Sequence, residues 1–391
     1  MRQAMTGNEA VAYAMKQINP EVVAAYPITP QTGIMQKFAD YVANGQVDTE
    51  FLTMDSEHSA MSATIGASAA GVRAMTATSS NGLAYMWEIV YIAASYRLPI
   101  VMPVVNRALS GPINIHCDHS DTMGCRDSGW IQIFSENSQE AYDNAVQALR
   151  IAEHPDVMLP VMITLDGFII SHALETLSTY EDDKVKKFIG NYIPKHPLIN
   201  PSQPVTYGPL DFFDYYFEHK RQQAEGMVNA KKVIQEVGRA FEKEFNRSYG
   251  LFEEYRMADA ELALIVLGST AGTAKAVVDM VREKGYKIGL IKIRCFRPFP
   301  EEELAEALKR IKVLAVMDRS LGFNGVGGPL FNDVRAALFG RNAEIKVVNY
   351  VYGLGGREIT PNDIWNICNN IRDINLTGKV QSSVNYVGVR E

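Results

Sequence analysis

The chain has 391 residues, 47% of them hydrophobic, which is enough for two or more packed domains. Its 45 acidic and 38 basic residues give a net charge of -7 without a basic block, which argues against nucleic acid or an anionic membrane surface as a partner. No apolar run approaches the roughly 20 residues of a membrane span, and residues 1–6 are unlike a signal sequence. We therefore expect a cytoplasmic protein whose partners are small molecules and other proteins.

The four cysteines are spaced too widely to form a Cys-x-x-Cys pair: Cys117, Cys125, Cys295 and Cys368. This spacing argues against a disulfide framework, a zinc site or an iron–sulfur cluster held by this chain alone. Any redox centre is therefore expected on another polypeptide.

Short β-branched runs alternate with longer helical patterns in the first part of the chain, which is typical of βαβ units around a parallel sheet. Strands are expected at 22–26, 50–53, 73–77, 99–105 and 158–164, and helices at 31–43, 57–71, 82–96 and 139–153. These elements predict one doubly wound α/β domain.

Residues 175–218 are rich in Pro, Tyr and Lys without a steady period, and 221–245 has the pattern of one charged amphipathic helix. We expect both to belong to a surface connector, at about 175–250, that closes a first domain spanning 1–255. The alternation then resumes, with strands at 262–267, 287–293, 313–317 and 345–350 and helices at 271–284, 301–310, 330–339 and 361–372. This predicts a smaller α/β domain over 256–375 and a C-terminal tail over 376–391.

The segment Tyr26-Pro27-Ile28-Thr29-Pro30 follows the first expected strand. Each proline fixes its own φ and pushes the preceding residue out of the helical region, so the segment is held extended and presents Thr29. Open α/β sheets bind ligands at the carboxyl ends of their strands. The Thr29 hydroxyl is therefore a candidate for contact with a substrate.

The helix expected at 57–71 is unusual because almost every residue after His58 is small. Such a helix is either packed tightly in the interior or approached closely by a cofactor or another chain. Glu57 begins this helix at a strand's carboxyl end, where a ligand contact is expected. The ordinary alternative is a carboxylate that satisfies free N–H groups at the helix start.

Arg107 follows the apolar strand at 99–105, again at a carboxyl end. Its planar guanidinium could bind a carboxylate through two parallel hydrogen bonds, or it could pair with Asp118 or Asp121. Residues 116–121 have the composition of a metal site but match no zinc spacing, so we expect a hydrogen-bonded loop and no metal. The segment 78–82 either cups an anion on its N–H groups or caps a helix.

Two glycine-rich loops, at 322–328 and 353–357, fit neither the dinucleotide fingerprint nor the P-loop pattern. We expect both to be turns. A nicotinamide-dependent dehydrogenase subunit is therefore a weak alternative, and nucleotide hydrolysis has no support.

The sequence resembles the alpha chain of the 2-oxoacid:ferredoxin oxidoreductases over nearly its whole length, and the likeness is greatest to the multi-subunit enzymes that act on pyruvate. Segments in the family's order carry the resemblance: 26–30, 55–60, 78–83, 106–109, 118–121, 267–270 and 297–300. It implies a thiamine-diphosphate pyrimidine-binding domain followed by a transketolase C-terminal-like domain.

The same resemblance implies an enzyme that decarboxylates a 2-oxoacid with thiamine diphosphate, reversibly, and passes electrons to ferredoxin and the acyl group to coenzyme A. This chain lacks the family's Gly-Asp-Gly segment, so a beta subunit would hold Mg²⁺ and the diphosphate. Iron–sulfur clusters would lie only on partners, among them gamma and ferredoxin-like delta subunits.

The family's functional positions fall on particular residues here. Glu57 would be the catalytic carboxyl that hydrogen-bonds the pyrimidine ring of the cofactor. The remaining cofactor contacts implied are Pro27, Ile28, Ser80 and Asn81.

Arg107 would bind the substrate carboxylate, and Thr29 would donate a hydrogen bond to the substrate. A short neutral threonine favours pyruvate over 2-oxoglutarate or oxalate and leaves a small branched acid such as 2-oxoisovalerate open. A non-catalytic scaffold subunit is the alternative from another class.

Overall fold

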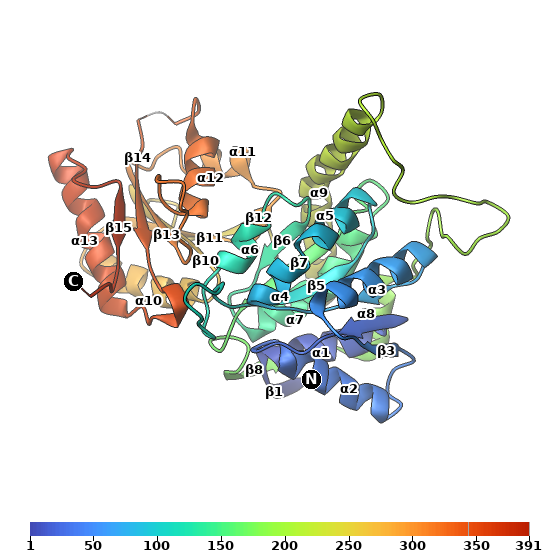
Figure 1. Cartoon of the computed structure of the whole chain (residues 1–391). Helices are drawn as coiled ribbons and strands as arrows, with labels where there is room; N and C mark the ends of the chain where they lie inside the picture. Colours follow the sequence, from blue (N-terminus) through green and yellow to red (C-terminus); the bar gives the residue numbers. More distant parts are fainter. Residues whose placement is uncertain (343, 391) are drawn as a thin grey trace.

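The computed structural model describes residues 1–342 and 344–390, and it contains two α/β units built on separate sheets. Figure 1 shows them beside each other, the first in blue to green and the second in yellow to red. The predicted α/β class with a doubly wound first domain is confirmed. Among the described residues, no helix combines the length and the apolar composition needed to cross a membrane.

The first sheet has the strand order β12-β6-β7-β5-β4-β2-β3. Its parallel strands are β2 (Val22–Ala25), β3 (Glu50–Thr53), β4 (Ala74–Met75), β5 (Val101–Asn106), β6 (Ile131–Phe134) and β7 (Val161–Asp166), and β12 (Cys295–Arg297) pairs antiparallel with β6. Strands β5 and β7 are buried throughout, because helices cover both faces of a doubly wound sheet.

Helices surround this sheet in the order α1 (Gly7–Ile18), α2 (Thr32–Ala43), α3 (Glu57–Ala70), α4 (Ser80–Tyr85), α5 (Trp87–Ser95), α6 (Ser120–Gly124), α7 (Ser138–Ala152), α8 (Asp182–Ile189) and α9 (Tyr216–Phe245). The single helix expected at 82–96 is wrong, because the chain bends at Met86 and forms α4 and α5. The sequence reading also missed α1, α6 and β6, and missed the small sheet in which β1 (Arg2–Thr6) pairs with β8 (Leu174–Ser178).

The second sheet has the order β15-β14-β13-β10-β11-β9. Its strands are β9 (Phe252–Tyr255), β10 (Leu262–Leu267), β11 (Ile288–Ile293), β13 (Val313–Asp318), β14 (Lys346–Val351) and β15 (Val384–Tyr386), with helices α10 (Thr270–Glu283), α11 (Glu301–Ala307), α12 (Pro329–Leu338) and α13 (Pro361–Thr377). Separate apolar clusters cover its two faces.

Three short strands connect regions that the sequence placed apart. Strand β9, assigned to the first domain, pairs with β11, and β15, assigned to the tail, pairs with β14. Strand β12 leaves the second unit and joins the first sheet. Strands of three or four residues are too short to show a hydrophobic period in the sequence, so these pairings could not be predicted. The domain boundaries at 255 and 375 remain predictions.

Candidate active site

The segment after β2 lies at the carboxyl end of the first sheet and leaves Pro27 and Thr29 exposed, whereas Pro30 is buried. Asn8 of α1 holds this segment in place, because its side-chain amide donates a hydrogen bond to the Pro30 carbonyl over 2.9 Å. The half-buried Ile28 lies between the two exposed residues. Thr29 is therefore presented to solvent on a supported segment, as expected, although the contribution of Asn8 was not foreseen.

Arg107 follows β5 and lies against this segment. Its Nη1 donates to the Thr29 carbonyl over 3.0 Å and its Nε to the Asn114 carbonyl over 3.0 Å. The side chain is 8% exposed, and it makes no ion pair with a carboxylate in the part of the chain that the structure describes. The alternative in which Arg107 pairs with Asp118 or Asp121 through its guanidinium is therefore wrong, and the structure brings Arg107 and Thr29 together.

Asp121, at the start of α6, joins two of the predicted site segments. Its Oδ2 accepts the backbone N–H groups of Ser80 and Arg107, each over 3.0 Å, and its Oδ1 accepts the Asn106 amide over 2.8 Å. Burial raises the pKa of this carboxyl to about 6. One buried carboxylate thus sets the distance between the Ser80 turn and the Arg107 loop.

Ser80 and Asn81 lie on that turn with different environments. Ser80 is buried with φ +47, and its Oγ donates to the Ala108 carbonyl over 2.5 Å. Asn81 is exposed, and its side chain exchanges hydrogen bonds with Ser110. Because the Ser80 N–H is already bound to Asp121, an anion cup at 78–82 would lack this donor.

Glu57 is the first residue of α3 and is 8% exposed. The helix is capped by its neighbour, since the Ser56 Oγ accepts the Ser59 N–H over 3.1 Å. The Glu57 carboxylate has no hydrogen-bond partner among the described residues, so the alternative in which it satisfies the helix start is not observed. A buried carboxylate of this kind is typical of a ligand contact.

The surroundings of Glu57 are polar and closely packed. A Cβ on Gly82 would lie 2.8 Å from a Glu57 carboxylate oxygen and 2.5 Å from the Thr78 hydroxyl, so only glycine fits between them. The hydroxyls of Thr78 and Ser79 are also buried without a hydrogen-bond partner. Two buried hydroxyls without a partner and one carboxylate without a hydrogen bond to the described residues therefore lie near the start of α3 and α4.

A second buried carboxylate, Asp166 at the end of β7, connects the two units. It accepts hydrogen bonds from His119 Nε2 over 2.7 Å, Arg319 Nη1 over 2.8 Å and Ser269 Oγ over 2.5 Å. Burial alone would raise the pKa of Asp166, but His119 and Arg319 outweigh it and hold the pKa well below its usual value. Cys117 lies close to His119 and Asp166, yet the Arg319 cation already occupies the side that a metal ion would need.

The glycine-rich loop at 353–357 extends this connection to the Arg107 loop. The Asn114 amide donates to the Gly355 carbonyl over 3.1 Å, and the Gly356 N–H donates to the Cys117 carbonyl over 2.6 Å. A Cβ on Gly356, where φ is +79, would lie 2.3 Å from the His116 Cβ. The loop forms a short 3₁₀ turn, as expected, and it also supports the site, which was not expected.

Comparison with known families places this geometry in context. A family described as "Pyruvate flavodoxin/ferredoxin oxidoreductase, thiamine diP-bdg" matches residues 13–239, and "Pyruvate:ferredoxin oxidoreductase core domain II" matches residues 260–364.

Curated relatives align along the whole chain. The chain is 58% identical to pyruvate synthase subunit PorA of Thermotoga maritima and 45% identical to that of Pyrococcus furiosus, covering 100% of this chain and 98% of each relative. It is 41% identical to ketoisovalerate oxidoreductase subunit VorA of Pyrococcus abyssi, covering 99% of this chain and 97% of the relative.

Two solved structures resemble the fold. One is a 2-oxoglutarate:ferredoxin oxidoreductase from Magnetococcus marinus with 2-oxoglutarate, coenzyme A and succinyl-CoA bound, with TM-score 0.73 and 19% identity, covering 94% of this chain and 65% of that chain. The other is a split-gene transketolase, an inactive beta4 tetramer, with TM-score 0.56 and 13% identity, covering 94% and 98%. At these identities the likeness concerns the fold alone.

The raised pKa of Asp121 predicts that the stability of the folded chain depends on pH, and Asp121→Asn should remove this dependence. Between the ordinary value of 3.8 and about 6, the folded chain binds a proton at this site that the unfolded chain has released. The wild type should therefore lose stability relative to Asp121→Asn as pH rises from 4 to 7, by up to about 3 kcal/mol. Urea unfolding of both proteins across this pH range measures the difference in their free energies of unfolding. The exposed Asp127→Asn is the control, and a pH-independent difference for Asp121→Asn would contradict the expectation.

Proposed function

The chain belongs to the pyruvate:ferredoxin oxidoreductase family, and from this premise we propose that it is the alpha subunit of a multi-subunit pyruvate synthase. The enzyme converts pyruvate and coenzyme A to acetyl-coenzyme A and CO₂ while ferredoxin is reduced, and the reaction is reversible. One observation within the fold carries the proposal: Glu57 and Arg107 lie at the carboxyl ends of one sheet, and neither forms an ion pair with another residue that the structure describes.

The residues around Glu57 fit the aminopyrimidine end of thiamine diphosphate. The Glu57 carboxyl and the Thr78 and Ser79 hydroxyls offer polar groups that lack protein partners, and Gly82 keeps the space between Glu57 and Thr78 open. Thiamine diphosphate, when bound, would supply a nucleophilic carbon for the 2-oxo carbon and a place for the electron pair left behind when CO₂ departs. Pro27 and Ile28, on the exposed segment, together with Ser80 and Asn81, are the further cofactor contacts in this proposal.

In this proposal Glu57 is the carboxyl group that contacts the aminopyrimidine ring. A protonated carboxyl group donates a hydrogen bond to a ring nitrogen of the aminopyrimidine and so favours the tautomer that acts as the internal base. The Glu57 side chain is 8% exposed, and its carboxyl group has no hydrogen-bond partner among the described residues, so it is available to a bound cofactor.

Arg107 and Thr29 position the substrate. Two of the Arg107 N–H groups are held by the Thr29 and Asn114 carbonyls, which fixes the plane of the guanidinium and leaves its other N–H groups for the pyruvate carboxylate. The exposed Thr29 hydroxyl donates to the oxo group. Thr29 is neutral, and the Arg319 cation is already bound to Asp166. A second carboxylate on the substrate would therefore find no cation at either position.

Arg126 is not a second cation for the substrate. It lines a cavity beside α9 together with Arg297, and it pairs with Asp127 over 3.8 Å. The specificity argument for a monocarboxylic 2-oxoacid therefore does not depend on it.

The remaining parts of the enzyme belong to partners in this proposal. A beta subunit holds Mg²⁺ and the diphosphate, and gamma and ferredoxin-like delta subunits carry the iron–sulfur clusters that pass electrons one at a time to ferredoxin. The outer side of α3 supports close approach by such a partner, because Ser62 and Gly66 are exposed and a Cβ on Gly66 would meet nothing within 4 Å.

A branched substrate is the second candidate, and the likeness to ketoisovalerate oxidoreductase subunits favours it over other acids. The native complex, captured through a tag on this chain, tests both. With coenzyme A present, reduction of a viologen dye should be fastest with pyruvate and slower with 2-oxobutyrate, 2-oxoisovalerate, 2-oxoglutarate and oxalate. Fastest turnover with 2-oxoisovalerate would reassign the substrate, and no turnover with any acid would indicate a scaffold.

Glu57→Gln should reduce kcat at least 100-fold, because a side-chain amide cannot present the same protonated oxygen to the ring nitrogen. Hydrogen–deuterium exchange at the reactive carbon of bound thiamine diphosphate, followed by NMR after acid quench, should slow in parallel. The neighbouring His58→Gln, on the same helix turn, is the control. Wild-type exchange and turnover in Glu57→Gln would remove this residue from the mechanism.

Arg107→Ala should raise the KM for pyruvate more than it lowers kcat, because it removes a charge-assisted contact to the substrate carboxylate worth about 2 to 5 kcal/mol. Arg107→Lys should recover only part of the loss, since a lysine cannot bind bidentately. Arg126→Ala, outside the site, should leave the KM unchanged. An unaltered KM in Arg107→Ala would exclude it from substrate binding.

A further inference from the structure

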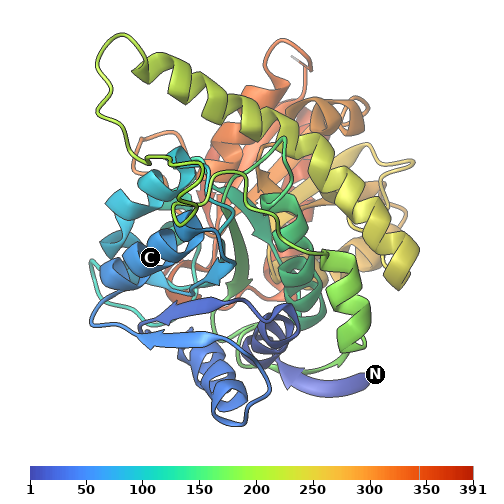
Figure 2. The same cartoon turned by 90° about the vertical axis from the view of Figure 1, so that its right-hand side faces the viewer.

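Helix α9 is packed against the body over only part of its length. From Gly226 onward it buries a regular series of residues, whereas 216–225 contains no buried residue. Figures 1 and 2 show this first part extending beyond the body and continuing into a long exposed connection. A helix end without tertiary packing is marginally stable in water, so a neighbour would be expected to cover it.

The exposed end carries a dense group of large apolar side chains, which we call the aromatic segment: Leu210, Phe212, Phe213, Tyr215, Tyr216 and Phe217. Phe213 is 100% exposed and Phe217 is 77% exposed. At roughly 200 Å² for a large aromatic side chain, the segment exposes on the order of 800 Å², which is about what one partner contributes to a standard protein interface.

The base of the aromatic segment is anchored. The rings of Tyr96 and Tyr207 lie 5.8 Å apart, and the Arg97 guanidinium donates to the Gln222 carbonyl over 2.9 Å. Asp211 and His219 pair with each other over 2.5 Å across the turn into α9. The segment is therefore presented in a defined position, which lowers the entropy that a partner must remove on binding.

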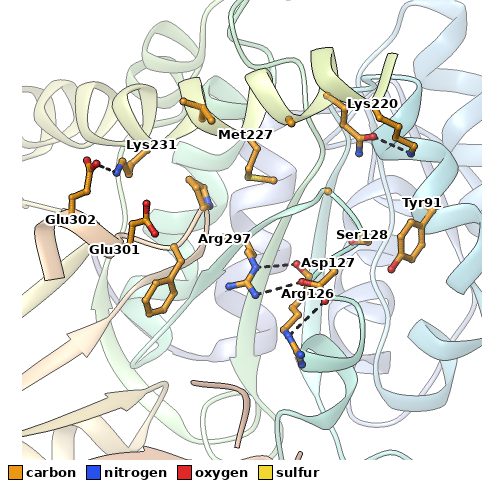
Figure 3. Close-up of a pocket in the computed structure, with 16 residues that line it drawn as sticks. Tyr91, Arg126, Asp127, Ser128, Lys220, Met227, Lys231, Arg297, Glu301 and Glu302 are labelled. Carbon is orange, nitrogen blue, oxygen red and sulfur yellow. Dashed lines mark hydrogen bonds and ion pairs between the residues drawn. The ribbon is translucent and has the colours of Figure 1, made fainter. Parts of the chain in front are cut away.

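A groove continues from the aromatic segment along the same side of α9. It is a cavity of about 700 Å³, and Figure 3 shows α9 forming one wall through Lys220, Met227 and Lys231. The Lys220 ammonium lies 5.7 Å from the centre of the Tyr216 ring, so the groove and the segment are contiguous. Residues 126–129 and 297–302 supply the opposite wall.

The charges of these two parts differ. In the groove Arg297 pairs with Asp333 over 3.0 Å and Lys231 with Glu303 over 3.2 Å, whereas Lys220 contacts the Gln223 side chain and the Tyr216 ring. Between residues 197 and 219 the sequence has three acidic residues and no Lys or Arg. Of these, Asp214 and Glu218 are exposed among the aromatic side chains.

We propose that the aromatic segment and the α9 groove bind a different subunit of the assembly, through an apolar surface of that subunit bordered by Lys and Arg. The proposal rests on the multi-subunit enzyme proposed above. The exposed Asp214 and Glu218 favour a partner surface bordered by cations, and a second copy of this chain is the other occupant that the test separates.

The test replaces Phe212, Phe213 and Phe217 with Ser in one variant. A second variant carries Asp214→Lys and Glu218→Lys. The control carries Phe323→Ser, Phe339→Ser and Leu376→Ser, which are also exposed but lie in the second unit. Each chain is co-produced with the partner subunits and captured through a tag, and subunit stoichiometry is measured by native mass spectrometry at low and moderate salt.

One partner subunit should be lost from the aromatic variant at both salt concentrations. The charge variant should bind the same subunit at least 10-fold more weakly than the wild type does. The control should retain every subunit. Circular dichroism and thermal unfolding of the isolated variants should match the wild type, because the replaced side chains are exposed.

Full stoichiometry in both variants would overturn the proposal. So would a variant that keeps every partner but changes the number of copies of this chain, because the occupant would then be a second copy. Stoichiometry does not depend on turnover, so an inactive complex with complete subunits would refute the proposed function without affecting this test.

Discussion

The buried carboxylate of Asp166 is the interaction on which the arrangement of the two units depends. It ends β7 of the first sheet and binds Ser269 and Arg319, which follow β10 and β13 of the second sheet. An unpaired carboxylate at this depth would cost several kcal/mol. His119 of the first unit and Arg319 of the second both pair with it and hold it ionised. The same contact holds His119, and through its loop the backbone that carries Arg107.

A second buried carboxylate, that of Asp121, positions the backbone of the candidate site. Asp121 binds the N–H groups of Ser80 and Arg107, and Asn8 fixes Pro30. The segments that carry Thr29, Ser80 and Arg107 are thus each held by a residue from another element. Because Arg107 is held by two carbonyls, its free N–H groups are already oriented, and little side-chain entropy is lost when a carboxylate binds.

Some site residues could be placed from the sequence alone, and others could not. The prolines around Thr29 and the apolar strand before Arg107 are local signals, and they placed both residues correctly at strand ends. The roles of Asn8, Asp121 and Asp166 depend on hydrogen bonds between segments far apart in the chain, for which one sequence gives no signal. The break at Met86 was also missed, because no Gly or Pro marks it and the helical pattern continues on both sides.

Glu57 shows why residue type and position alone could not decide between structure and function. A carboxylate at a helix start normally satisfies free N–H groups, but here Ser56 already accepts the N–H of Ser59. The chain therefore contains both a cap and a buried carboxylate, and only the first is needed for the helix. The Glu57 carboxylate makes no hydrogen bond within the described part of the chain, so it is available to a ligand. That asymmetry, visible only once the cap is located, is the strongest physical argument that this end of the sheet was built to bind a cofactor.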